Sequence, residues 1–256
     1  MRIGIIGATG WLGSALGAGL LRGGFAPGDL VLLNRSGPRE SYHGREGIEW
    51  ARDPGDLAGR AEVVVVSVRP EDWPGLALKA PGRLVVSFMA CVPLAALAAT
   101  GGRVVRAMPN GAAEAGRSYT PWLAGPGVTA ADRRAVAAIV GAIGTGDEVG
   151  SEREIDFLTA LSGSGTAYPA LMAAAMLTAA RGAGLAPLVA ERAVAAVVCD
   201  GGAMLAGRVG EAEAVLEVYR GYRGTTAAGL AAAEAAGFRA AVAAALVAGA
   251  AVAAGK

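Results

Sequence analysis

Three glycines near the N-terminus are spaced as in a phosphate-binding turn. The segment Gly7-Ala8-Thr9-Gly10-Trp11-Leu12-Gly13 follows a short apolar run and precedes a stretch of small residues that suits a helix. In such a strand-turn-helix unit, backbone N–H groups and the helix N-terminus point toward a bound pyrophosphate. A tight turn without a ligand is the alternative, but the place at the start of a β-α-β unit favours dinucleotide binding. The spacing is one residue longer than the usual fingerprint, and the expected contacts come from Gly7, Thr9, Gly10, Trp11 and Leu12.

The end of the second apolar run carries the residues that choose between the two nicotinamide dinucleotides. Asn34, Arg35 and Ser36 lie about twenty residues beyond the last glycine, where NAD-binding domains commonly carry an acid for the ribose hydroxyls. No acid is present there. A guanidinium beside amide and hydroxyl groups suits a ribose 2′-phosphate. The sequence therefore predicts NADP(H), and the alternative for Arg35 is a solvated charge at a strand end.

The elements that position these loops follow from short apolar runs bounded by Gly or Pro. Their length and valine content are typical of buried parallel strands. We expect strands at 2–6, 30–33, 62–68, 83–88 and 103–107, edge strands at 119–123 and 146–149, and helices at 11–22 and 129–140, the last with Thr129 as a candidate N-cap. The pattern predicts an α/β domain with a parallel sheet over residues 1–150.

The second part of the chain, residues 151–256, is expected to be all helical. Alanine-rich segments of helical length are broken at 163–165, 182–187, 207–210 and 221–224. Alanine buries little area, so these helices form a thin core by themselves. We therefore predict a homodimer or higher homo-oligomer formed through them. The apolar run 240–255 is shorter than the roughly 20 residues of a spanning helix, and we expect a helix packed all round by protein.

Composition excludes several other functions. The chain has 23 Lys and Arg against 22 Asp and Glu, so no basic field favours nucleic acid or an anionic membrane. Cys91 and Cys199 lie far apart in apolar runs, which argues against a disulfide or a thiolate metal site. We expect a cytoplasmic protein without a metal. The one histidine, His43, is expected at the surface near the adenosine side of the cofactor.

Five motifs occur in an order that resembles pyrroline-5-carboxylate reductases. They are Asn34-Arg35-Ser36, Ser67-Val68-Arg69-Pro70, Val105-Arg106-Ala107-Met108-Pro109-Asn110, Leu161 to Tyr168, and Gly224-Thr225-Thr226-Ala227-Ala228-Gly229-Leu230. The resemblance spans nearly the whole chain. It implies a Rossmann-type, doubly wound parallel sheet followed by an all-helical dimerisation domain, with the active site between the cofactor of one subunit and the helices of its partner.

The reaction that the resemblance implies is hydride transfer from NAD(P)H to the imine carbon of a cyclic imino acid, which gives proline. On this analogy the cofactor is contacted by Ser67, Val68, Arg69, Pro70, Phe88 and Ala90, with Met108, Pro109 and Asn110 near the nicotinamide. The substrate is surrounded by Ser164, Gly165, Arg223, Gly224, Thr225 and Thr226. Thr226 matches the threonine that hydrogen-bonds the imine nitrogen and is the expected catalytic residue.

Hydride transfer to an imine makes few chemical demands on the residues of such a site. A protonated imine accepts hydride readily and forms in solution, so the enzyme must mainly align two planar rings and hold a carboxylate. N–H groups at the start of the helix opened by Thr225 and Thr226 suit that carboxylate. The alternative for both threonines is a plain helix cap.

The approach to the threonines departs from the family. Gly221 and Arg223 stand where a short Ser-Pro-Gly-Gly run has serine and glycine, Thr166 replaces a proline, and Cys91 replaces a glycine. Arg223 is expected to bind an anionic group of the substrate; the alternative is that Arg220 and Arg223 point to solvent or to a partner subunit. Three functions remain open: pyrroline-5-carboxylate reduction, reduction of another cyclic imine or keto substrate, and NADP binding without turnover.

Overall fold

A computed structural model describes residues 1–255 of the chain, which divides into two compact units. The first unit comprises Met1–Ser164 and the segment from Val247 onward, and the second comprises Gly165–Leu246. The strands of the first unit are β1 (Ile3–Ile6), β2 (Leu30–Leu33), β3 (Glu49–Trp50), β4 (Val63–Val66), β5 (Leu84–Ser87), β6 (Arg103–Ala107), β7 (Ser118–Tyr119), β8 (Trp122–Ala124) and β9 (Gly144–Thr145). Its helices include α1 (Trp11–Arg22), α2 (Pro54–Arg60), α3 (Trp73–Leu76), α4 (Leu94–Leu97), α5 (Ala130–Gly141) and α6 (Glu152–Leu158).

The main sheet is parallel except at one edge. Its order is β3-β2-β1-β4-β5-β6-β8, and only β8 runs antiparallel to its neighbour, β6. The chain moves outward from β1 to β2 and β3 and then returns to β4 on the other side of β1. The carboxyl ends of β1 and β4 therefore flank a topological switch point, where open α/β sheets bind ligands. The predicted doubly wound parallel sheet is confirmed.

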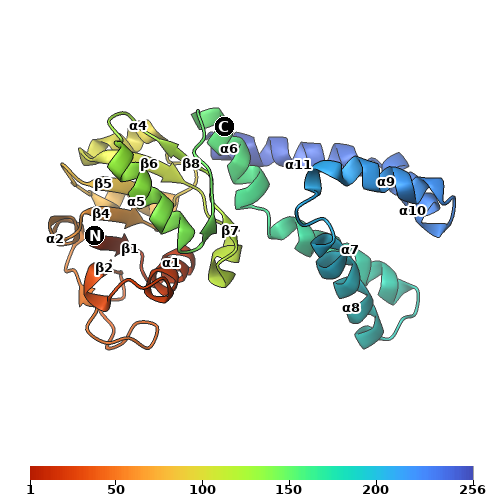
Figure 1. Cartoon of the computed structure of the whole chain (residues 1–256), viewed down its shortest axis with the longest axis horizontal. Coiled ribbons are helices and arrows are strands. Elements are labelled where there is room, and N and C mark those ends of the chain that lie inside the picture. Colours follow the sequence, from red (N-terminus) through yellow and green to blue (C-terminus); the bar gives the residue numbers. More distant parts are fainter. Residues whose placement is uncertain (256) are drawn as a thin grey trace. The chain divides into compact units, whose positions relative to one another are not determined.

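Helices cover both faces of this sheet (Figure 1). Leu16 and Leu20 of α1 and Ile139 of α5 are buried on one face, whereas Leu57 of α2 and Leu97 of α4 are buried on the other. The strand interiors are nearly pure Val, Ile and Leu, as two-sided burial requires. These two apolar layers fix the loops at the carboxyl ends of the strands.

The predicted edge strands were placed wrongly. The segment 119–123 is divided between β7 and β8, since Pro121 has no N–H to donate to a ladder. The segment 146–149 forms only an isolated bridge, Trp122 with Glu148, and the paired residues are those of β9 just before it. The short strand β3 was not predicted. The helix α5 begins as expected, because the Thr129 hydroxyl accepts from the Asp132 N–H in a capping box.

The remaining part of the described chain is helical. Its helices are α7 (Ala167–Gly182), α8 (Pro187–Ala195), α9 (Ala212–Gly221), α10 (Thr225–Ala235) and α11 (Phe238–Ala253). The predicted break at 163–165 precedes α7, and the breaks at 182–187, 207–210 and 221–224 fall where one helix ends and before the next is established. Between Gly165 and Leu246 only Ala190 and Val194 are buried, so the expectation of a thin core is confirmed.

The last helix departs from its prediction. Val247 and Val252 of α11 are 67% and 64% exposed, so their own chain does not enclose the helix. No single helix among residues 1–255 has the length and composition of a membrane span; α10 and α11 meet the criteria only as a pair, bent by 48°. The domain boundary at residue 150 stays a prediction.

Candidate functional site

The turn after β1 has a backbone that only glycine allows. Gly7 has φ of +84°, and a Cβ there would lie 2.2 Å from the carbonyl oxygen of Ser67. A Cβ on Gly13 would lie 2.3 Å from the carbonyl oxygen of Gly7. The first turn of α1 therefore approaches the end of β1 closely. Its first N–H groups have no intrahelical partners and are available to an anion.

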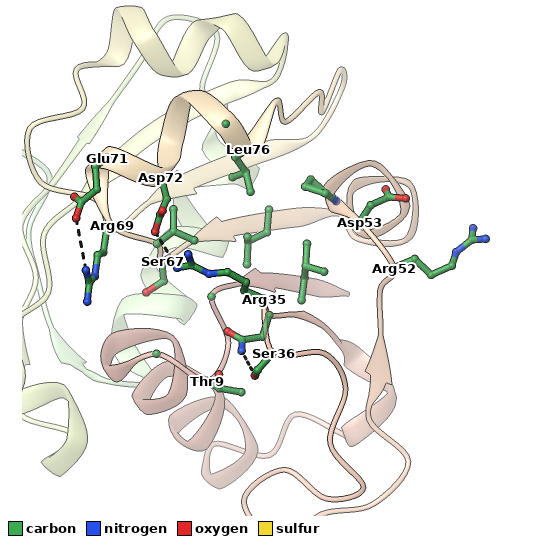
Figure 2. A pocket seen from close by; sticks show the side chains of 18 residues that line it. Thr9, Arg35, Ser36, Arg52, Asp53, Ser67, Arg69, Glu71, Asp72 and Leu76 are labelled. Carbon is green, nitrogen blue, oxygen red and sulfur yellow. Dashed lines mark hydrogen bonds and ion pairs between the residues drawn. The ribbon is translucent and has the colours of Figure 1, made fainter.

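A pocket of about 1070 Å³ opens beside this turn, at the carboxyl ends of β1, β2 and β4. Figure 2 shows the side chains around it. The pocket is large enough for a ligand of dinucleotide size, since ligand pockets measure roughly 300–1,000 Å³. The predicted residues that line it are Gly7, Thr9, Gly10, Asn34, Arg35, Ser36, Ser67, Val68 and Arg69.

Two ion pairs between arginines and acidic residues lie at the rim of the pocket. The Arg35 guanidinium, 86% exposed, lies 3.3 Å from a carboxylate oxygen of Asp72, and the Arg69 guanidinium lies 3.8 Å from Glu71. Both arginines line the pocket and are largely exposed, and each guanidinium points toward its paired carboxylate (Figure 2). Exposed ion pairs contribute little free energy, about 0–1 kcal/mol. A phosphate dianion can therefore draw either guanidinium away from its carboxylate.

Asn34 and Ser36 complete this part of the rim. The Asn34 Nδ2 donates to the Ser36 hydroxyl at 2.6 Å. An amide and a hydroxyl thus lie next to the guanidinium of Arg35, all from the end of β2. Donors of three kinds on one short segment suit the oxygens of a ribose phosphate.

Sequence reasoning missed the residues that close the pocket from β3 and from the turn after β4. They are Arg52, Asp53, Pro54, Glu71, Asp72, Gly75 and Leu76, together with Ile6 and Leu33 of the strand ends. Arg52 follows β3, which pairs in parallel with β2, the strand that precedes Arg35; its side chain points away from Arg35 (Figure 2). The short β3 gives too weak a pattern to be recognised. Glu71 and Asp72 adjoin the predicted segment 67–70 and could have been found by extending it.

Other predicted cofactor residues lie outside this pocket. Trp11 opens α1 and is 63% exposed, whereas Leu12 packs against the core. Pro70 begins a 3-10 turn after β4. Phe88 and Met108 are almost fully buried, and Ala90 packs beside Met108.

A second group of predicted residues meets at the end of β6. The Asn110 Nδ2 donates to the carbonyl oxygen of Ser162 at 2.8 Å, while its Oδ1 accepts from the Ala112 N–H. A Cβ on Gly163 would lie 3.4 Å from Cγ of Met108. The Ser164 hydroxyl donates to the carbonyl of Thr159 at 3.3 Å. The Met108-Pro109-Asn110 motif therefore holds the chain just before the helical unit.

A buried arginine of β6 holds α6, the helix that precedes Ser162 and Ser164. Arg106 is 1% exposed; its guanidinium pairs with Glu152 and lies 3.0 Å from Asp156 of α6. Glu152 also accepts from the backbone N–H of Leu94 at 2.8 Å. A buried arginine is stable only with such partners. The ion pairs anchor α6, which leads into Ser162 and Ser164.

The predicted substrate residues of the helical unit lie on one loop and helix start. Gly224 is the N-cap of α10, and no side chain caps this helix. Thr225 and Thr226 occupy the first helical positions and are exposed. Neither threonine is therefore the N-cap of α10, and the substrate role of Thr225 and Thr226 stays a prediction. The first N–H groups of α10 lack intrahelical acceptors, and they lie beside the two hydroxyls.

Arg220 and Arg223 differ sharply in their surroundings. Arg220 pairs with Glu217 and lies 3.1 Å from Glu213 and 2.6 Å from Glu234, and hydrogen bonds to these carboxylates raise its pKa. Arg220 is thus part of the helical framework, which corrects the alternative that it points to solvent. Arg223 has φ of +47°, and within residues 1–255 no carboxylate forms an ion pair with it.

The described residues give no sign of metal or disulfide chemistry. Within 1–255, no three His, Cys, Asp or Glu side chains gather as metal ligands would. Cys91 and Cys199 are free and exposed. His43, which is exposed, lies 3.1 Å from the Ser14 hydroxyl beside the glycine turn.

The sheet, the glycine turn and the pocket at the switch point define a dinucleotide-binding domain of the Rossmann type. Residues 2–91 match the family described as NADP oxidoreductase, coenzyme F420-dependent, and residues 152–255 match the family described as pyrroline-5-carboxylate reductase dimerisation. The chain belongs to the pyrroline-5-carboxylate reductase family.

Individual relatives agree along most of the chain. The pyrroline-5-carboxylate reductase of Mycobacterium tuberculosis is 35% identical over 81% of this chain and 75% of its own length. That of Thermus thermophilus is 34% identical over 92% of this chain and 90% of its own. The structure of Plasmodium falciparum pyrroline carboxylate reductase with NADP bound superposes with a TM-score of 0.84, at 22% identity, over 100% of this chain and 97% of that one. This last likeness establishes the fold.

Proposed function

We propose that this protein reduces pyrroline-5-carboxylate to L-proline with NADPH. The main structural observation for NADPH binding is the pocket at the switch point. It is lined both by the glycine turn and by Arg35. The names of the relatives support the same substrate. The fold and the pocket alone fit several reductases, so the substrate rests on family membership and on the loop before α10.

The residues present fit NADPH. A Cβ at Gly7 or Gly13 would collide with the backbone of Ser67 or of Gly7, so only glycine lets α1 begin this close to the end of β1, where its N-terminus can receive a pyrophosphate. Arg35, with Asn34 and Ser36 beside it, suits the 2′-phosphate that distinguishes NADPH from NADH. Met108, Pro109 and Asn110 are assigned to the nicotinamide side. When bound, NADPH supplies the hydride.

The helical residues bind and orient the imino acid. The N–H groups at the start of α10 hold its carboxylate, and the Thr226 hydroxyl hydrogen-bonds the imine nitrogen. An iminium formed in solution needs no protein acid, so alignment of the two rings is the main task of the site. Ser164, Gly165, Gly224 and Thr225 are assigned to the substrate in this proposal.

Arg223 supports a second candidate, a cyclic imine with an additional anionic group. Its guanidinium has no carboxylate partner within residues 1–255, whereas Arg220, three residues earlier, has three. A free guanidinium next to the carboxylate-binding helix start favours a more anionic substrate. In the proposed assignment, Arg223 strengthens binding of the single carboxylate of pyrroline-5-carboxylate.

We further propose a homodimer or larger homo-oligomer in the cytoplasm. Residues 1–150 form the cofactor domain and residues 151–256 the dimerisation domain. Exposed apolar side chains of the helices, Leu171 at 70% and Met204 at 75% among them, support burial against a second copy.

A substrate panel tests the function. Purified protein is given NADPH and one of four compounds: pyrroline-5-carboxylate, its six-membered homologue, a cyclic imine with a second carboxylate, or a cyclic imine without a carboxylate. The proposal expects the largest kcat/KM for pyrroline-5-carboxylate and a large loss without the carboxylate. Faster turnover of a dianionic imine would favour the second candidate. Tight NADPH binding without turnover of any imine would favour a cofactor-binding protein.

A further inference from the structure

The glycine turn is held from behind by a tyrosine that the function described so far does not use. The Tyr42 hydroxyl donates to the carbonyl oxygen of Ala8 at 2.8 Å, and the carbonyl oxygen of Gly13 lies 3.3 Å from the same hydroxyl. Ala8 and Gly13 stand on the two sides of the turn. One hydroxyl therefore joins the entry of the turn to the first turn of α1.

The position of Tyr42 is closely defined by packing. The residue is 4% exposed, and a Cβ on Gly17 of α1 would lie 2.2 Å from its hydroxyl oxygen. Its ring packs edge-on against Trp50, at a centroid distance of 6.2 Å. Burial raises the pKa of the Tyr42 hydroxyl above its ordinary value, so the group remains a hydrogen-bond donor at neutral pH.

The neighbouring histidine adds a second contact to the same helix. His43 lies edge-on to the Tyr42 ring at 4.4 Å, and its Nε2 is 3.0 Å from the carbonyl oxygen of Ser14 and 3.1 Å from its hydroxyl. Tyr42 and Arg45 exchange backbone hydrogen bonds that close the loop. The loop between β2 and β3 thus packs a small rigid hairpin onto the start of α1.

Neither Tyr42 nor His43 lines the pocket that Gly7, Thr9 and Gly10 line. The Ala8 carbonyl belongs to the peptide group whose N–H is that of Thr9, so holding this carbonyl fixes the direction of an N–H on the pocket's lining. The Gly13 carbonyl belongs to the peptide of Ser14, whose N–H donates to the Gly10 carbonyl at 2.8 Å, so this contact fixes the first turn of α1. The turn is one residue longer than the usual fingerprint, and a longer turn has more conformations to lose when it binds a ligand. A fixed carbonyl on each side of the turn reduces that loss before the ligand arrives.

We propose that Tyr42 is a positioning residue for the pyrophosphate of the dinucleotide, acting through the Ala8 and Gly13 carbonyls. This inference rests on the proposed function, because it assumes that the glycine turn holds NADPH. Since NADPH and NADH share the pyrophosphate, Tyr42 serves both cofactors equally. In this respect Tyr42 differs from Arg35, which serves the 2′-phosphate alone.

The test compares Tyr42→Phe with the wild type and with Tyr119→Phe. The first change removes only the hydroxyl and keeps the ring in its packing. Tyr119 is the matched control, because its hydroxyl donates to Asp147 at 3.0 Å and does not line the pocket. Calorimetric titration gives the Kd for NADPH and for NADH. Hydrogen exchange of residues 7–14 without cofactor reports the order of the turn, and thermal melting reports the fold.

For Tyr42→Phe we expect both Kd values to rise by about three- to tenfold, because this is the scale of losing one hydrogen bond. In Tyr42→Phe the KM for NADPH rises together with the Kd, while kcat at saturating cofactor is unchanged. Amide hydrogen exchange of residues 7–14 becomes faster. Tyr119→Phe behaves as wild type in each measurement. Unchanged Kd values and unchanged exchange would overturn the inference alone, as would a loss confined to NADPH. A wild-type chain that binds neither dinucleotide would overturn the proposed function as well.

Discussion

Nη2 of Arg35 lies 3.3 Å from Oδ2 of Asp72, so the cation assigned to the 2′-phosphate shares the pocket rim with a carboxylate from the turn after β4. The two residues come from opposite sides of the switch point. A bound phosphate would compete with Asp72 for the guanidinium and would be repelled by the carboxylate. Cofactor preference at this rim is therefore a balance between two named side chains.

Removal of the carboxylate tests the competition. In Asp72→Asn the repulsion of the 2′-phosphate disappears and Arg35 is released. We expect the Kd for NADPH to fall by about two- to fivefold, the scale of one exposed ion pair. The Kd for NADH should stay as it is. Weaker binding of NADPH by this variant would mean that Asp72 orients Arg35 instead of competing for it.

Charge reversal at Arg35 tests the phosphate assignment itself. Arg35→Asp should raise the Kd for NADPH by about thirtyfold or more, since charged hydrogen bonds contribute about 1.5–3 kcal/mol. The Kd for NADH should change much less. Arg22→Asp, in the last turn of α1 and outside the pocket, is the matched charge reversal. Equal losses of NADPH and NADH in Arg35→Asp would contradict the assigned role.

The loop before α10 gives a prediction about the substrate. Arg223→Ala should raise KM for pyrroline-5-carboxylate by about tenfold, the scale of one charge-assisted hydrogen bond, and leave KM for NADPH unchanged. Arg220→Ala should instead lower the melting temperature, because Glu217 loses its cation and Glu213 and Glu234 then share Arg239 alone. An unchanged substrate KM in Arg223→Ala would show that Arg223 points to solvent or to a partner subunit.

Acid stability of the first unit should depend on the pair of Arg103 and Asp132. The guanidinium, 2.7 Å away, and hydrogen bonds from Thr129 hold the pKa of Asp132 below its ordinary value of 3.8. A lowered pKa in the folded state stabilises the fold above the unfolded pKa, and this contribution is lost as pH falls toward the folded value.

Urea unfolding of Asp132→Asn at two pH values measures this contribution. Near neutral pH the variant should lose about 2 kcal/mol of unfolding free energy, because a largely buried charged pair is broken. The difference from wild type should narrow as pH falls below about 4, because the Asp132 carboxylate of the unfolded chain takes up a proton near its ordinary pKa of 3.8 while the folded carboxylate is still ionised. A difference that is constant with pH would mean that packing, and not the charge, is responsible.

Strong local patterns made much of the fold predictable. Residues 30–33 and 103–107 form strands, and residues 11–22 form a helix, with the predicted bounds. These segments are uniformly apolar or bounded by Gly and Pro, so local sequence and burial agree. The edge strands failed because Pro121 divides one run, and because a two-residue strand such as β3 has no period to recognise.

The pocket was predictable where its residues follow a strand directly. Arg35 and Ser67 stand at the ends of β2 and β4, and a parallel sheet brings such ends together. Tyr42 was missed because it belongs to the irregular loop between β2 and β3, and Arg52 was missed because it follows the two-residue strand β3. Their places depend on tertiary packing against α1 and on the register of β3 with β2, which the sequence pattern does not encode.

The central claim is hydride transfer from NADPH to the imine carbon, and an isotope label follows it most directly. The protein is incubated with pyrroline-5-carboxylate and with NADPH that carries deuterium at the transferable position, and the product is analysed by mass spectrometry and NMR. The account predicts L-proline in one-to-one ratio with the oxidised cofactor, with one deuterium at the former imine carbon. No proline while NADPH remains bound, or proline without the label, would contradict it.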